Sequence, residues 1–416
     1  MAHRLALQFP TLTLARHFRM AARNIVRQRR RSAMALLTVC GGVVAILLAG
    51  GFVEWVFSAL RDSTIHSQLG HIQVTRPGYF RQGIADPYNY LLPAEIAPEV
   101  QEGRGHIVSV APRLAFSGLL GTGESSVSFI GEGIDPVRER QITRALKIVS
   151  GRDLRDNGDQ AAVLGRGLAS ALGVKAGDRV VLLVNAAAGG VNAVELEVAG
   201  VFSSMIKAYD DSALRVPVDI ARKLLRVDGA TSWVLLLDDH AHTTVEANRL
   251  KREARDVEVT PWYDMADFYN KTVGLFSRQL GVVQTLIGLI VVLTITNTLA
   301  MAVRERTGEI GTILATGSRR REVLSLFVCE GALLGLFGGI LGLILGAILA
   351  AIISAIGIPM PAAPGMTEGY TGEILITPAL GLQALLLAAA TTTIASIVPA
   401  MHAARMNIVD ALRHAR

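Results

Sequence analysis

The stretch RERTGEIGTILATGSRRREV, residues 304–323, lies between two long apolar runs and decides the fold. Its charged residues stand toward both ends and include Arg304, Glu305, Arg306, Glu309, Arg319, Arg320 and Arg321. Between them, Ile310, Ile313 and Leu314 recur at helical spacing. A loop that only fixes membrane topology needs basic residues but no apolar stripe. The pattern therefore predicts a short amphipathic helix, within 304–322, that has a further role.

The composition places this stretch in an integral membrane protein. Hydrophobic residues make up 51% of the chain and charged residues 18%, whereas about a quarter of a soluble domain is charged. The apolar residues fall into runs of about 20 residues or more, the length that spans a bilayer as a helix. The predicted transmembrane helices are residues 34–57, 280–303, 323–358 and 380–401.

The distribution of arginine predicts the orientation, because cytoplasmic loops are enriched in Lys and Arg. Seven arginines stand between residues 16 and 31, and no acidic residue appears before Glu54. The tail, residues 402–416, is also basic, whereas the loop 359–379 contains Glu368 and Glu373 and no Lys or Arg. Both termini and the stretch 304–322 are therefore expected in the cytoplasm, and the long insert 58–279 outside it.

The N-terminal segment, residues 1–33, is expected to form a basic amphipathic helix on the inner membrane surface. Its apolar positions recur at helical spacing and are Leu14, Phe18, Ala22, Ile25 and Val26. An ordinary basic flank is the simpler alternative. The first span has a longer apolar core than a signal peptide and no clear cleavage site after it, so an uncleaved anchor is predicted.

The insert 58–279 is expected to be an α+β domain. Strands are predicted at 71–76, at 106–134 with a Gly-rich turn, at 177–184, at 195–204 and at 232–238. Helices are predicted within 161–174, 216–225 and 243–254. Residues 265–277 are expected to be helical and to lead into the second span as a stalk.

The search for catalytic or cofactor chemistry predicts none. GLLGTGESS, residues 118–126, lacks the Lys-Ser/Thr pair of a phosphate loop, and a hairpin turn is the better interpretation. No G-x-x-x-x-G-K-[ST] occurs in the sequence, so the chain is not expected to bind ATP itself. The net charge of +6 comes with basic residues beside the apolar runs and does not indicate nucleic-acid binding. Cys40 and Cys329 lie in or beside spans and predict neither a disulfide nor a metal site.

Two polar features remain ambiguous. In DDHAH, residues 238–242, a metal could be held by Asp238, His240 and His242, but such a segment after a strand is more typical of a solvated loop, and no metal site is predicted. Glu54 and Glu330 lie near span ends, and the spans hold almost no other ionisable residue. This argues against an ion-coupled transporter, which would place such a group deep in the membrane.

The third span carries two rows of glycines at four-residue spacing. They are Gly331, Gly335 and Gly339 in one row, and Gly338, Gly342 and Gly346 in the other. Small residues at this spacing let helix backbones approach closely. Packing against another span of the same chain and a dimer seam are both compatible with the pattern.

Residues 304–338 resemble the membrane block of the FtsX/MacB-like family of ABC transporter permeases. The matching features are Arg304 and Arg306, then Glu309, Ile310 and Gly311, then Thr316 and Gly317, then Glu330 entering the Gly-rich span. The closing segment VPAMHAARMNIVDALRH is similar to the family's C-terminal motif, with Pro399, Ala400, Ala403, Ala411, Leu412 and Arg413 matching and Val409 in place of proline. The order of one span, a large outer domain and three spans also matches.

The resemblance implies a non-catalytic permease subunit in a bacterial inner membrane, with a MacB-like periplasmic core domain. It implies a dimer, either a homodimer or a heterodimer with a paralogous permease, that pairs with a cytoplasmic ABC ATPase holding the ATP. In this family, ATP-driven closure is thought to move the outer domains through the membrane helices.

The resemblance implies that the stretch 304–322 is an ATPase-coupling helix. Ile310, Ile313 and Leu314 are expected to dock into a groove of the ATPase, with Arg306 and Glu309 as the charged rim. Gly317 is expected to end the helix and Ser318 to cap the next one. Replacing Leu314 with Glu is then expected to abolish ATPase association.

Two functions follow from the resemblance. One is lipoprotein release or export of a lipid, peptide or drug-like molecule, with a periplasmic adaptor or lipoprotein carrier as a further partner. HIQVTRPGYF and VEVTPWYDMADFY are somewhat similar to the LolC/LolE branch. The other is FtsX-like signalling to a periplasmic cell-wall hydrolase without transport. Besides these proteins, only membrane lipid is expected to contact the chain.

Overall fold

The computed structural model describes residues 19–407 apart from 22, 24–26, 28, 85, 124 and 363–368. The chain divides into two compact units. The membrane unit comprises the described parts of residues 1–56, 274–358 and 371–416, and the outer unit those of residues 57–273 and 359–370. The apolar positions expected for the N-terminal helix, Glu368, and the last part of the closing motif from Val409 to Arg413 lie outside the described residues.

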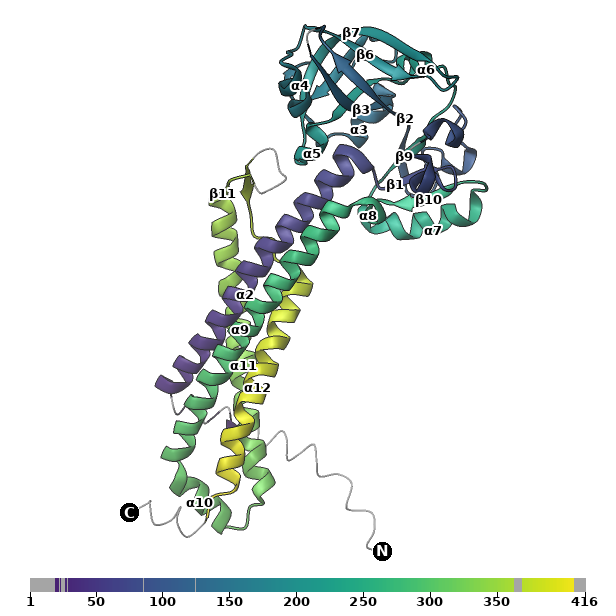
Figure 1. The fold of residues 1–416 in the computed structure, drawn as a ribbon. Helices are drawn as coiled ribbons and strands as arrows, with labels where there is room; N and C mark the ends of the chain where they lie inside the picture. The colour runs from purple at the N-terminus through teal and green to yellow at the C-terminus, as the bar shows by residue number, and fades with distance from the viewer. Residues whose placement is uncertain are drawn as a thin grey trace, which may run out of the picture. The chain divides into compact units, whose positions relative to one another are not determined.

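Four long apolar helices build the membrane unit, and each is long and apolar enough to cross a membrane (Figure 1). They are α2 (Arg29–Thr64), α9 (Asp267–Glu305), α11 (Arg320–Ile356) and α12 (Pro378–Ala404). The short helix α10 (Thr307–Ala315) stands between α9 and α11. A single helix, α9, covers the expected stalk residues from Asp267 onward and the second predicted span, whereas Met265 belongs to the short helix that precedes it.

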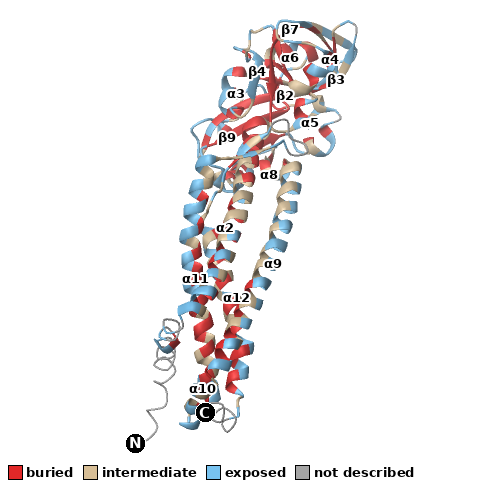
Figure 2. Ribbon diagram, turned by 90° about the vertical axis from the view of Figure 1, so that its left-hand side faces the viewer, coloured by how far each residue is buried: buried red, intermediate tan, exposed pale blue. Residues whose placement is uncertain are grey.

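The membrane helices are apolar on nearly all sides, as expected for spans rather than for surface helices. Their buried positions form stripes, whereas large apolar side chains such as Leu286, Ile344 and Leu382 are exposed (Figure 2). The shared core includes Val43, Leu47, Ile295, Ala384 and Ala388. Thr296 on α9 also donates a hydrogen bond of 3.0 Å to the carbonyl oxygen of Ala395 on α12.

One mixed sheet of ten strands forms the framework of the outer unit, which is an α+β fold as predicted. The strands are β1 (Ile72–Thr75), β2 (Ile107–Gly121), β3 (Ser126–Ile134), β4 (Lys147–Gly151), β5 (Ala161–Gly165), β6 (Arg179–Asn185), β7 (Val191–Ser203), β8 (Ala213–Pro217), β9 (Ser232–Leu237) and β10 (Glu258–Pro261). Their order is β10-β1-β9-β2-β3-β8-β5-β7-β4, and β6 pairs with β2 and β7. The β3–β8 and β5–β7 pairs are parallel.

Short helices cover this sheet. They are α3 (Pro136–Ile142), α4 (Arg166–Leu172), α5 (Lys207–Asp210), α6 (Val218–Leu225), α7 (Thr243–Glu253) and α8 (Trp262–Met265). Single turns of other helix types are η1 (Ile65–Leu69), η2 (Tyr79–Gly83), η3 (Pro87–Tyr90), η4 (Pro98–Val100) and η5 (His240–His242). A separate small ribbon pairs β11 (Ile358–Met360) with β12 (Tyr370–Gly372).

Two main hydrophobic cores divide the outer unit into two lobes. The larger core packs α4 and α6 on the sheet and includes Phe116, Phe129, Leu164 and Leu224. The other core packs α7 on β1, β9 and β10 and includes Trp233, Leu235 and Leu250. The long strand β2 contributes to both cores.

Two sequence predictions for this unit need correction or comment. The helix predicted within 161–174 begins only at Arg166 in the structure. Residues 161–165 instead form β5, whose residues are all buried. The hairpin predicted over residues 118–126 is confirmed: β2 ends at Gly121, β3 begins at Ser126, and the Thr122 N–H donates to the Ser125 carbonyl oxygen at 3.1 Å.

Candidate functional site

The helix α10 ends in a tight glycine turn. Gly317 has a φ of +93°, in the left-handed region that favours glycine. The Gly317 N–H donates to the Leu314 carbonyl oxygen at 3.1 Å, and the Ser318 N–H donates to the Ile313 carbonyl oxygen at 3.3 Å. These two bonds form a Schellman motif, which ends α10 and turns the chain toward α11.

The prediction that Ser318 caps the next helix is wrong. The residue at the N-cap of α11 is Arg319. Its backbone N–H donates to the Glu322 carboxylate at 3.2 Å. An acidic residue in the first turn thus accepts a hydrogen bond from a backbone donor at the start of the helix. Ser318 is instead used in the turn that closes α10.

The apolar stripe of α10 faces the chain's own helices. Ile310 is 3% exposed and Leu314 is 8% exposed, and Ile313 is partly buried beside them. Their neighbours include Val323 and Phe327 on α11. Val303 on α9 and Ala400 and Ala403 on α12 complete this cluster, which we name the α10 core.

Docking of this stripe into a partner's groove is therefore a wrong prediction. The apolar residues of α11 and α12 already form the groove for this stripe, and the hydrophobic effect favours its burial there without a partner. Leu314→Glu would place a charge inside the α10 core and disturb folding. That variant cannot test partner binding.

The opposite side of α10 is polar and open. Its exposed positions follow helical spacing from the end of α9 to the end of α10, and they are Glu305, Glu309, Thr312 and Thr316. We name this surface the α10 outer face. Glu309 Oε1 is 2.7 Å from Nη2 of Arg27, and Glu305 pairs with Arg31, so the basic N-terminal flank partly neutralises it. The Arg27–Glu309 pair is well exposed and is expected to be weak.

Arg306 is not part of a charged rim, which corrects a second prediction. Its residue is 6% exposed, and its Nη1 lies 3.7 Å from Oε2 of Glu330, which is 4% exposed. Glu309 Oε2 lies 3.8 Å from the Arg306 Nε. Buried charges are seldom found without a partner. This ion pair therefore joins the start of α10 to the first turns of α11, and no local sequence pattern indicates that the two residues meet.

The two glycine rows of α11 both pack inside the chain. A Cβ atom at Gly331, Gly335 or Gly339 would lie within 2.6 Å of a side chain of α12. A Cβ atom at Gly338, Gly342 or Gly346 would lie within 2.8 Å of Val39, Val43 or Leu47 on α2. Both rows are thus filled by the chain's own spans, and neither row is free to form a dimer seam.

Gly335→Ala is expected to destabilise the membrane unit by about 1–3 kcal/mol through overpacking. Its Cβ would lie 2.1 Å from the Thr392 Oγ1 and 3.0 Å from the Ala389 Cα. The readout is the thermal unfolding midpoint of the purified chain in detergent. Gly41→Ala in α2 is the matched control, because no atom lies within 4 Å of its Cβ position. Equal midpoints for the two variants would contradict this packing.

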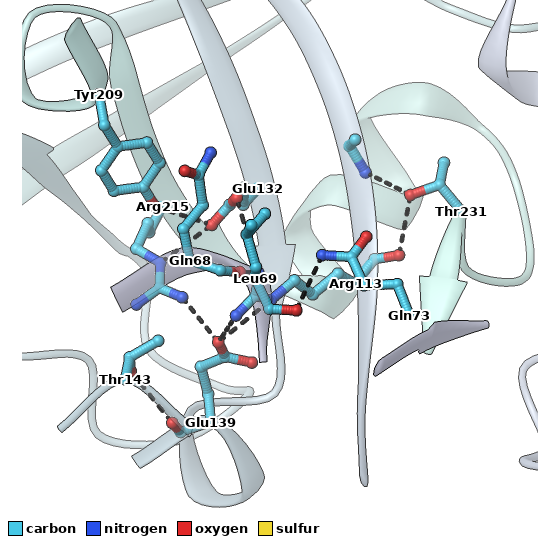
Figure 3. Close-up of polar contacts among 11 residues, drawn as sticks. Gln68, Leu69, Gln73, Arg113, Glu132, Glu139, Thr143, Tyr209, Arg215 and Thr231 are labelled. Atoms are coloured by element: carbon cyan, nitrogen blue, oxygen red, sulfur yellow. Dashed lines mark hydrogen bonds and ion pairs between the residues drawn. The ribbon is translucent and has the colours of Figure 1, made fainter. Parts of the chain in front are cut away.

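A buried polar network lies in the outer unit (Figure 3). Glu139 Oε1 accepts from Nε of Arg113 at 3.1 Å and from Nη2 of Arg215 at 2.8 Å. Glu132 Oε2 accepts from Nε of Arg215 at 3.2 Å and from the Tyr209 hydroxyl at 3.0 Å. Arg113 also donates to the carbonyl oxygen of Gln68 in η1. We name these residues the arginine–glutamate network.

The network is structural rather than catalytic. Arg113, Glu139 and Arg215 are each at most 4% exposed, and every charge has an opposite partner. Burial acts to raise the pKa of Glu139, but the two arginines outweigh it and hold this pKa below its usual value. Burial, together with Glu132, raises the pKa of Tyr209. These groups hold η1, α3 and three strands together, and the charged groups of Arg113, Glu139 and Arg215 are shielded from solvent.

The comparisons with known proteins agree with this architecture. Residues 32–253, more than half of the chain, match the family described as MacB-like periplasmic core domain. Residues 281–408, which contain α10 and its packing partners, match the FtsX-like permease C-terminal family. The chain belongs to the FtsX/MacB-like family of ABC transporter permeases.

Several relatives of this permease carry descriptive names. It is 26% identical over 313 residues to the lipoprotein-releasing system transmembrane protein LolC of Neisseria meningitidis, covering 73% of this chain and 72% of LolC. It is 25% identical over 351 residues to the macrolide export ATP-binding/permease protein MacB of Chromobacterium violaceum, covering 78% of this chain and 51% of MacB. An uncharacterized ABC transporter permease of Methanocaldococcus jannaschii is 24% identical over 332 residues, covering 76% of this chain and 79% of that protein.

Proposed function

We propose that this permease transmits ATP hydrolysis by a separate cytoplasmic ATPase to movement of its outer unit. The observation that carries the proposal is α10, whose apolar side is anchored on α11 and α12 while its polar side is open. The sequence contains no G-x-x-x-x-G-K-[ST], so the ATP would be held by the partner. In this proposal, the two termini and α10 are cytoplasmic and the outer unit is periplasmic.

The anchoring of α10 suits it to pass on a force. The α10 core, the Arg306–Glu330 pair and the closing turn at Gly317 fix α10 to the ends of three long helices. A partner that binds the α10 outer face and changes shape would therefore move α9, α11 and α12 together, rather than bend a loose loop. The coupling roles of Arg304, Arg306 and Glu309 then differ, because only Arg304 and Glu309 are exposed to a partner.

We propose lipoprotein release as the first assignment of function. Export of a lipid, peptide or drug-like molecule is the alternative. LolC, a lipoprotein-releasing system protein, aligns over 72% of its own length, whereas the MacB alignment covers 51% of MacB. The active assembly would be a dimer, with a second copy or a paralogous permease. A lipoprotein carrier or a periplasmic adaptor would be a further partner.

The proposal is tested by purifying the tagged permease from its native membranes in mild detergent and identifying what is bound to it. A P-loop ATPase in stoichiometric amount is the expected result, and a lipoprotein or its carrier would support the release branch. Absence of any ATPase would contradict the proposal. A co-purifying cell-wall hydrolase in place of a carrier would instead favour FtsX-like signalling.

A further inference from the structure

Three side chains gather at one corner of the outer unit, outside the proposed coupling machinery. His106 stands directly before β2, and Asp238 stands directly after β9. Because β2 and β9 are antiparallel neighbours, these two residues meet across the sheet, and the Asp238 N–H donates to the His106 carbonyl oxygen at 3.2 Å. His242 comes from η5, the turn that leads into α7.

The donor atoms of these side chains converge. Nδ1 of His106 lies 3.1 Å from Oδ2 of Asp238, and Nδ1 of His242 lies 2.8 Å from Oδ1 of Asp238. One ligand atom from each residue lies within 4.8 Å of the other two. Ligands bound tetrahedrally to Zn²⁺ at about 2.0–2.1 Å are roughly 3.3 Å apart. A metal ion could therefore replace the shared protons once the two imidazole rings turn, so that both Nδ1 lone pairs point at the ion.

The fold of the loop brings His242 back over Asp238. Asp239 accepts a hydrogen bond from the Ala241 N–H at 2.8 Å, and Thr243 Oγ1 donates to the His240 carbonyl oxygen at 2.7 Å. The rings of His106 and His242 stack, with centroids 3.7 Å apart and planes at 19°. His240 is directed elsewhere: its Nδ1 lies 3.1 Å from Asp239 Oδ1. The sequence suggests at most a trio with His240 and predicts no metal site, whereas the side chains that converge in the structure include His106 in place of His240.

The chemistry of this cluster suits a cation. Asp238 offers one carboxylate oxygen to each imidazole. The three side chains are 39–49% exposed, which leaves one side open to water ligands and to metal entry. Two imidazoles and a carboxylate are ligands that Zn²⁺ and related divalent transition metals accept, whereas Mg²⁺ and Ca²⁺ prefer oxygen ligands.

We propose that His106, Asp238 and His242 form a Zn²⁺ site at the start of β2, the end of β9 and the turn before α7. Its remaining coordination positions are filled by water. The bound ion would link the strand ends to the start of α7. This assignment does not depend on the permease's partner or substrate.

Zinc binding is measured on the full-length permease in detergent, purified with a tag that contains no histidine and stripped with a chelator. A chromophoric chelator competes for Zn²⁺, and Co²⁺ serves as a spectroscopic substitute. The wild-type chain is expected to bind one equivalent of Zn²⁺ and to give the visible absorption of a tetrahedral or five-coordinate Co²⁺ complex. His242→Ala is expected to weaken binding by at least about tenfold, since even outer-shell changes cost roughly 10–100-fold.

His240→Ala is the matched control, because this histidine lies in the same turn but outside the cluster. It should bind Zn²⁺ as the wild type does, whereas Asp238→Asn and His106→Ala should resemble His242→Ala. All four substitutions are at exposed side chains, and their unfolding midpoints check that each protein is folded. Equal binding by all variants, or no binding by the wild type, would overturn the site.

Discussion

Glu139→Ala is expected to destabilise the outer unit by about 3–5 kcal/mol, since removing one partner of a buried ion pair leaves the other charge buried and unpaired. Here two arginines lose their shared carboxylate, because Glu139 Oε1 accepts from both Arg113 and Arg215. Glu132 stays beside Arg215, so part of the compensation is retained. The measurement is denaturant unfolding of the full-length permease, followed by the fluorescence of the tryptophans in the outer unit.

Glu195→Ala is the control for this substitution. Its carboxylate lies 3.6 Å from Arg179 in an exposed pair, and such pairs contribute less than about 1 kcal/mol. A loss for Glu139→Ala no larger than that for Glu195→Ala would show that the arginine–glutamate network does not hold the outer unit together.

Lowering the pH should remove the stabilisation that the Glu139 carboxylate gives to the folded state. The pKa of Glu139 is lower in the folded protein than its usual value, since the arginines outweigh the effect of burial. A carboxylate with a lowered pKa stabilises the folded state fully above its unfolded pKa of about 4.3, and this contribution is lost as the pH falls through the folded value. The difference in stability between wild type and Glu139→Ala should therefore shrink at low pH.

Thr312→Arg is expected to remove most of the bound ATPase, at least about tenfold, which corresponds to 1.4 kcal/mol of binding free energy. Thr312 lies at the centre of the α10 outer face and is exposed. Its hydroxyl donates to the Gly308 carbonyl oxygen at 2.9 Å within the same helix. A long charged side chain there would obstruct a partner without disturbing the α10 core. The readout is the amount of ATPase that co-purifies with the tagged permease.

The matched control is Thr244→Arg, which makes the same change on the exposed side of α7 in the outer unit. Its ATPase content should equal that of the wild type. If Thr312→Arg retained its ATPase fully, the α10 outer face would not be the docking surface.

The parts of the fold that could be predicted are those with a local signal. Apolar runs indicate membrane spans directly, and the helical spacing of Ile310, Ile313 and Leu314 indicates α10. Gly317 indicates its end, because few other residues adopt a positive φ without strain. Which surface the apolar stripe faces has no local signal, since it depends on residues of α11 and α12 that are distant in sequence.

The parts that could not be predicted depend on contacts between distant segments. Residues 161–165 are predicted from the sequence to be helical. Pairing with β7 on one side and β8 on the other makes this segment a buried strand. Arg306 and Glu330 each stand out in the sequence, yet only the packing of α10 against α11 joins them. His106 is far from the DDHAH segment in sequence and reaches it only because β2 pairs with β9.

The central claim is that ATP hydrolysis in a partner moves the outer unit. The most direct measurement is a pulsed electron-spin distance between Ser170→Cys in the outer unit and Ile356→Cys at the end of α11. Cys40 and Cys329 are replaced, and the permease–ATPase complex is held in lipid nanodiscs. The account predicts that the distance distribution shifts when ATP is trapped with vanadate and returns when the nucleotide is removed. An unchanged distribution in a complex that hydrolyses ATP would contradict it.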